Sequence, residues 1–186
     1  MEKIIMKKVV LILGLFTLCN LSFGQQKIDF NLENSCCYYG EKVEEDIYSF
    51  ASTQEAEKIV KRILDVVGLE PNFTIMAANV PNAMAVIENQ MRHILYSQDF
   101  IMRIDNATGT DWASLSILAH EIAHHLQGHT ITSSGSRPNL ELEADKWSGF
   151  VCAKLGATLD QAQAAMKSIA SNTGSSTHPP KSARLE

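Results

Sequence analysis

The stretch HEIAHHLQGH, residues 120 to 129, holds four of the six histidines of the chain and one glutamate. His120 and His124 are four residues apart, so on an α-helix they lie on one face, one turn apart, and can share a metal ion. Glu121 lies between them and points to the side. This is the HExxH pattern, in which two neutral imidazoles bind zinc and the glutamate acts as general base toward a water that the zinc makes acidic.

The chance occurrence of this motif is low. Three fixed residues match by accident at roughly one position in 8,000, so about 2% of chains of this length carry the motif without a metal. The neighbouring residues also favour a metal site, because an apolar stripe on another face of the helix packs while the histidines face a cleft. This stripe consists of Leu115, Leu118, Ile122 and Leu126. We therefore expect one zinc ion per chain.

A catalytic zinc needs a third protein ligand, and the segment ELEAD, residues 141 to 145, offers three carboxylates. Glu141 and Asp145 are four residues apart and share a helix face, whereas Glu143 points in a very different direction. One carboxylate of the Glu141/Asp145 pair can bind the metal while the other holds a ligand histidine by its second nitrogen. Glu143 is then expected to be solvated or paired with Lys146.

Together, HEIAHHLQGH, ELEAD and the later segment STHPP…R resemble the HtpX and CAAX-prenyl-protease type of gluzincin metallopeptidase, family forty-eight of the metallopeptidases. The chain is most similar to the soluble, exported members, and the resemblance covers roughly residues 73 to 186. The resemblance implies that Glu121 is the general base and that Asp145 binds the second ring nitrogen of a ligand histidine. The zinc ligands that it implies are His120, His124 and Glu141.

The resemblance extends to three further segments. ANVPNAMAV resembles the region around the family's edge strand, which implies a polypeptide substrate that binds as an added β-strand. His178 matches a loop that can approach the zinc, where it could stabilise an oxyanion, gate the open position or only fix the loop. Arg184 matches a recurrent arginine, with a simple salt bridge as the alternative. His125 and His129 are interpreted as structural. His129 follows Gly128, the expected end of the helix, and is expected to lie away from the ion as a structural or loop contact. Tyr48 and Tyr96 are further conceivable oxyanion donors.

The N-terminus has the features of a secretory signal peptide. Three lysines precede the apolar run from Val9 to Cys19, and cleavage is expected after Gly24. This run is too short to span a bilayer, which takes about 20 residues. The alternative, a lipoprotein anchored at Cys19, is disfavoured because Leu18 occupies a position that requires a small residue. Residues 1–24 are thus predicted to be a signal peptide of a periplasmic or secreted protein without a transmembrane segment. Peripheral association with a membrane is left open.

Charge and cysteine content set further limits. The formal net charge is −5 and the chain has no basic cluster in its body, so nucleic acid is not an expected partner. Export permits disulfides, but the three cysteines after the signal peptide (Cys36, Cys37 and Cys152) leave at least one unpaired. We favour small buried side chains or one optional disulfide over a zinc site at the adjacent pair.

The pattern of elements predicts one α+β domain over residues 25–186, with a zincin-like fold of the minimal gluzincin type. A small mixed sheet is expected to pack on the HExxH helix, followed by a second, ligand-bearing helix. Residues 25–50 are expected to form an arm with a helix from Glu41, and residues 172–186 a loop tail that can open a further helix. The other expected elements are a helix capped at Ser52, three strands within residues 73–97 with a hairpin at Glu88–Gln90, and helices near 111–127, 139–156 and 158–171.

These observations predict a zinc endopeptidase acting on misfolded or envelope proteins. The first alternative is a chaperone-like quality-control protein with little peptidase activity, whose site is gated by His178. The second is another zinc hydrolase, such as an aminopeptidase, although no cluster that would anchor a free amine is evident in the sequence.

Overall fold

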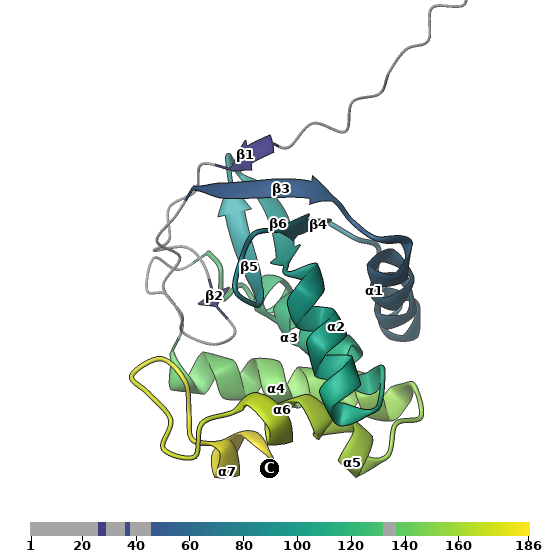
Figure 1. Cartoon of the computed structure of the whole chain (residues 1–186), viewed down its shortest axis with the longest axis vertical. Coiled ribbons are helices and arrows are strands. Elements are labelled where there is room, and N and C mark those ends of the chain that lie inside the picture. The colour runs from purple at the N-terminus through teal and green to yellow at the C-terminus, as the bar shows by residue number, and fades with distance from the viewer. Residues whose placement is uncertain (1–25, 29–35, 38–45, 132–136) are drawn as a thin grey trace, which may run out of the picture.

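The computed structural model describes residues 26–28, 36–37, 46–131 and 137–186, which form an α+β fold (Figure 1). The predicted signal peptide and most of the predicted N-terminal arm lie outside the described residues. No helix in the described ranges is both long enough and apolar enough to cross a membrane.

The sheet is mixed, as predicted, and its strand order is β1-β3-β4-β6-β5-β2. Only β4 and β6 pair in parallel; the other neighbours are antiparallel. The short β2 lies at one end of this strand order and pairs with β5. The strands are β1 (Gln26–Ile28), β2 (Cys36–Cys37), β3 (Ile47–Ala51), β4 (Thr74–Ala78), β5 (Ala83–Glu88) and β6 (Met91–Tyr96).

The predicted hairpin is confirmed between β5 and β6. Its register runs from Ala83 opposite Tyr96 to Glu88 opposite Met91, which leaves a two-residue turn. Asn89 and Gln90 form this turn with positive φ values of 48° and 66°. Two successive residues of positive φ are typical of the tight turn that matches the twist of a hairpin.

The predicted helix from Glu41 is wrong for the part of it that the structure describes. Residues Ile47–Ala51 form β3, which pairs with both β1 and β4. The expected cap at Ser52 is also off by one residue, since the Thr53 side chain accepts the N–H of Ala56 and begins α1 (Gln54–Val67). The physical reason is tertiary: pairing with β4, far along the chain, supports an extended conformation that local periodicity did not indicate.

Helix α3 (Trp112–Leu126) passes between the sheet and α4 (Pro138–Lys154) and forms the centre of the molecule (Figure 1). Every residue from Ala113 to His125 is buried. The predicted apolar stripe is thus part of a helix that is covered on all sides, as in the core of a larger protein. The polar residues of its second half must therefore find partners inside the protein.

The remaining helices enclose α3. The ambiguous segment after β6 is helix α2 (Gln98–Thr108), with Ser97 as its N-cap and Gly109 as its C-cap. The predicted capping box of Thr158 and Gln161 is confirmed at the start of α5 (Leu159–Ala162), and α6 (Ala164–Ile169) follows. The tail ends in a short helix, α7 (Lys181–Arg184), which packs on α4 and α6.

Candidate metal centre

Three buried donors converge where α3 and α4 pack together. The Nε2 atoms of His120 and His124 are 3.0 Å apart. Oε2 of Glu141 lies 3.2 Å from Nε2 of His120, and Oε1 of Glu141 lies 3.5 Å from Nε2 of His124. A zinc ion with Zn–N distances near 2.0–2.1 Å in a tetrahedral site separates its ligands by about 3.3 Å. These three side chains can therefore hold a metal ion.

The histidine tautomers agree with this arrangement. The Nδ1 atoms of His120 and His124 are engaged by Asp145 at 2.9 Å and by His129 at 2.9 Å. Both Nε2 atoms then present lone pairs to one another across 3.0 Å unless a proton or cation lies between them. The chemistry of the donor set thus fits a cation, with two imidazole nitrogens and a carboxylate around one point.

His120 is held by two acids. Burial disfavours its charged form, yet hydrogen bonds to Asp145 and Glu141 raise its pKa to about 9. The same contacts oppose the effect of burial on Glu141 and lower its pKa to about 2. Burial and the charge of His120 lower the pKa of His124 well below its ordinary value. At neutral pH the raised pKa keeps a proton on His120, at the place where a cation would bind.

Glu121 is buried beside the three donors, and neither of its carboxylate oxygens has a hydrogen-bond partner among the described residues. Burial raises its pKa to about 8, opposed mainly by the charge of His120. The backbone N–H of Ala85 on β5 lies close enough to lower this pKa but does not reach hydrogen-bond geometry. A buried carboxyl without a partner is costly, and such groups mark places where a ligand, ion or water completes the site.

Asp145 and Arg184 form a bidentate pair behind His120. The Nε of Arg184 lies 2.7 Å from Oδ2 of Asp145, and its second terminal nitrogen lies 2.9 Å from Oδ1. That nitrogen is also 3.5 Å from Glu141. These contacts agree with the predicted role of Asp145. For Arg184 the contacts favour the salt-bridge alternative, in which this arginine connects α7 to Asp145 and Glu141 on α4.

His178 reaches the same cluster from the tail. Its Nε2 lies 3.3 Å from Oε2 of Glu141, and its Nδ1 contacts the Thr177 hydroxyl. The loop that carries it closes on Gly174, whose φ is 67° and whose missing Cβ would lie 2.7–2.9 Å from backbone atoms of residues 178–180. Only glycine fits there, which sequence reasoning did not identify. The three roles considered for His178 all remain compatible with this position.

The structure places His129 and Glu143 differently from the sequence-based interpretation. His129 was expected to lie away from the ion, but it is buried and contacts the ligand His124. Glu143 was expected to be solvated or paired with Lys146; its side chain is half exposed, and its Oε2 additionally lies 3.2 Å from Nε2 of His129. Helical periodicity could not show this, because Gly128 turns the chain back toward α3 with a φ of 75°.

His125 does have the structural role that the sequence indicated. It is buried, its Nε2 lies 2.9 Å from the carbonyl oxygen of His93, and its Nδ1 lies 3.2 Å from the Thr130 hydroxyl. Burial lowers its pKa to about 4, so it stays neutral. The helix of the HExxH motif is thereby fixed to β6.

The two tyrosines and Cys152 lie outside the cluster. The Tyr96 hydroxyl is engaged by Thr53 at the start of α1, and Tyr48 belongs to β3, which β4 and β6 separate from β5. Neither is placed as an oxyanion donor. Cys152 is a free, buried thiol, which agrees with the small-side-chain interpretation.

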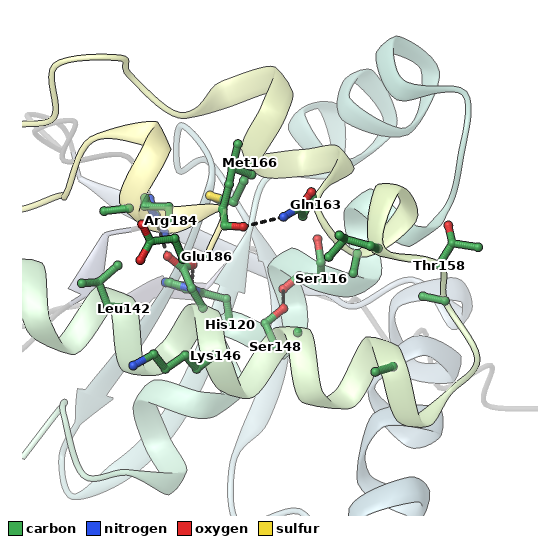
Figure 2. A pocket seen from close by; sticks show the side chains of 18 residues that line it. Ser116, His120, Leu142, Lys146, Ser148, Thr158, Gln163, Met166, Arg184 and Glu186 are labelled. Atoms are coloured by element: carbon green, nitrogen blue, oxygen red, sulfur yellow. Dashed lines mark hydrogen bonds and ion pairs between the residues drawn. The ribbon is translucent and has the colours of Figure 1, made fainter.

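A cavity of about 500 Å³ lies on the Nδ1 side of His120, between α4, α5, α6 and α7. Figure 2 shows His120 and Arg184 toward one end of it, and Thr158 toward the other. His124, Glu121 and Glu141 do not line it. The cavity therefore lies on the far side of His120 from the other candidate metal ligands and does not open onto Glu121.

Comparison with the models of protein families, with curated proteins and with solved structures finds no match for this chain.

Proposed function

We propose that this chain is an exported zinc endopeptidase with a zincin-like fold of the gluzincin type, in which His120, His124 and Glu141 bind the metal. The observation that carries the proposal is the unpartnered carboxylate of Glu121, buried directly beside these three donors. A structural metal site has no need of a free carboxylate next to it, whereas a hydrolytic site requires a base there.

A zinc ion at this place would act as a Lewis acid and would make a water molecule acidic enough to attack a carbonyl near neutral pH. Glu121 takes the proton of the attacking water and passes it to the leaving amine. Its raised pKa of about 8 suits the second step, in which it must act as an acid. A nearby cation favours the carboxylate form, which the first step requires. Asp145 and Arg184 keep the His120 ring in position throughout.

The substrate in this proposal is a polypeptide in extended conformation, bound along the edge of β5. Ala85 of this strand has its backbone N–H close enough to Glu121 to lower the pKa of that carboxyl. At the start of the strand, both amide atoms of the buried Asn82 side chain have no hydrogen-bond partner among the described residues. A strand near a base and an unsatisfied amide at the start of that strand are features that suit peptide binding.

The edge of β5 carries a short segment of the chain itself. Cys36 and Cys37 pair with Ala85 and Met84 in an antiparallel arrangement, and Ala85 is the residue of β5 whose N–H affects Glu121. A substrate strand that adds to the same residues takes the place of this two-residue pairing. The pairing is short, so its displacement costs little compared with the gain from a longer substrate strand.

The contact between His178 and Glu141 supports one alternative, a gated protein with little hydrolysis. The His178 imidazole lies 3.3 Å from the carboxylate of Glu141, where it can occupy the position that water or substrate needs. In that case the protein is a gated, chaperone-like quality-control protein with little hydrolysis. In the peptidase, the same imidazole stabilises the oxyanion of the substrate carbonyl.

Hydrolysis of an unfolded protein such as casein tests the proposal. Wild-type protein is expected to cleave it, to lose activity with a metal chelator and to regain it with zinc. The variant His178→Ala separates the two candidates: a loss of activity supports the oxyanion role, and activity that appears only in the variant supports the gate. If neither wild type nor variant cleaves in the presence of zinc, the endopeptidase proposal is wrong.

A further inference from the structure

His124 is supported by a different kind of group from the one that supports His120. Nδ1 of His120 lies 2.9 Å from a carboxylate oxygen of Asp145. Nδ1 of His124 instead lies 2.9 Å from Nδ1 of another imidazole, His129. The rings of His124 and His129 meet edge to face, with centroids 5.1 Å apart. Both side chains are buried.

The backbone fixes His129 in this place. After α3 ends, Gly128 adopts a φ of 75° and the N–H of His129 donates to the carbonyl oxygen of His124 at 2.9 Å. The contact between the two rings is therefore built into the end of the HExxH helix. A residue with Cβ at position 128 would strain this turn.

The direction of each hydrogen bond follows from metal binding. When His124 binds through Nε2, its Nδ1 carries the proton and is a donor, so Nδ1 of His129 must accept. Nε2 of His129 is then the donor, and it lies 3.2 Å from Oε2 of Glu143. Glu143 only accepts when it is ionised. The chain of groups thus has one consistent direction, from His124 through His129 to Glu143.

We infer that His129 is a positioning residue for the metal ligand His124, and that Glu143 fixes the tautomer of His129. All three acids of ELEAD then serve one metal: Glu141 binds it, Asp145 supports His120 and Glu143 supports His124 through His129. Glu143 points away from Glu141 on α4, yet it reaches the site around the end of α3. The inference rests on the metal site of the proposed function and not on peptidase activity.

Metal affinity tests this directly. The apparent dissociation constant for zinc is measured by competition with a chelator for wild type, His129→Phe, His129→Asn and Glu143→Gln. Loss of an outer hydrogen bond to a ligand histidine costs about 10- to 100-fold in affinity, and this loss is expected for His129→Phe. His129→Asn, whose side-chain oxygen can accept where Nδ1 did, should recover part of it. Glu143→Gln, at a half-exposed position, should lose less than His129→Phe and keep the fold.

His125→Phe is the matched control, because this buried histidine adjoins a ligand and contacts His93 and Thr130 instead of His124. Its zinc affinity should stay near that of wild type. Cobalt substitution adds a spectroscopic readout, since His129→Phe should shift the visible bands and His125→Phe should not. Equal affinity of His129→Phe and wild type, or equal losses in both phenylalanine variants, would overturn the inference. Absence of zinc binding by wild type would overturn the metal centre itself, a result that the competition assay separates from the others.

Discussion

The Nε2 atoms of His120 and His124 face each other at 3.0 Å, while the opposite nitrogen of each ring is held by a different partner. Asp145 contacts Nδ1 of His120 and His129 contacts Nδ1 of His124, so each ring has its own support. Two neutral imidazoles with facing lone pairs would repel each other, so a proton, as on His120 in the metal-free protein, or a cation lies between them. A cation between them turns the repulsion into binding.

The first prediction concerns stoichiometry and stability. Purified protein is expected to hold about one zinc per chain, by elemental analysis. Because zinc binds only the folded chain, a concentration 100-fold above the dissociation constant should stabilise it by about 2.7 kcal/mol. Glu141→Gln should lose most of this stabilisation, since it removes the anionic ligand. A melting temperature that does not respond to chelator and zinc would contradict the assignment.

The pH dependence of the metal-free chain follows from two raised pKa values. Glu121 and His120 have pKa values of about 8 and about 9 in the folded protein, against ordinary values of 4.5 and 6.5. The folded state binds these protons more tightly than the unfolded state, so their contribution to stability is present at low pH and lost as pH rises. Below about pH 6.5 the lowered pKa values of His124 and His125 act in the opposite direction, because these histidines bind protons more tightly in the unfolded state. With chelator present, the melting temperature should therefore fall between about pH 7 and pH 9.

Glu121→Gln is the control for this effect. An amide does not titrate, so the decline in melting temperature of the variant should be smaller, and what remains belongs largely to His120. With zinc present the trend should reverse, because zinc binding releases the His120 proton and is favoured at higher pH. A metal-free melting temperature that rises from pH 7 to pH 9 would show that neither group is perturbed as stated.

Gly174 controls the position of His178. In Gly174→Ala the new methyl group meets the backbone of residues 178–180 and the residue is forced into a left-handed conformation. We expect a loss of about 1–3 kcal/mol in the free energy of unfolding, and an altered activity as the His178 loop moves. The matched control is Gly149→Ala in α4, where an added Cβ meets nothing within 4 Å. That variant should be neutral or slightly more stable.

The pairing of β2 with β5 predicts an effect of the N-terminal segment on activity. Proline has no N–H and does not fit a strand pair, so Cys36→Pro with Cys37→Pro should free the edge of β5 and increase cleavage of casein. The control Cys36→Ser with Cys37→Ser keeps the backbone and removes both thiols. Equal activity of the proline variant and wild type would mean that the segment does not compete with substrate.

Much of this structure follows from local signals in the sequence. The His120/His124 spacing, the Glu141/Asp145 spacing, the hairpin at Asn89 and Gln90 and the capping box at Thr158 are all fixed by helical periodicity, turn chemistry or capping. The spacing argument left open which acid of ELEAD binds the metal, and the structure brings Glu141 to the two histidines.

The parts that sequence reasoning missed depend on contacts between distant residues. β3 is a strand because β4 pairs with it, and this pairing has no local signal. His129 reaches His124 only because the chain reverses at Gly128, whose presence suggested the end of the helix but not the direction of the next side chain. Gly174 is required by backbone that lies four to six residues later. In both places the available signal in the sequence was the glycine itself, Gly128 or Gly174, because glycine readily adopts the positive φ that these turns need.

Side-by-side assay of wild type and Glu121→Gln, with zinc content measured on the same samples, tests the proposed chemistry most directly. The variant keeps the size of the side chain and all three metal ligands but cannot take a proton. We predict that it binds about one zinc per chain, like wild type, and that its cleavage of casein falls by at least about 100-fold. Zinc-loaded Glu121→Gln that cleaves casein as fast as wild type would contradict the assignment of Glu121 as the base.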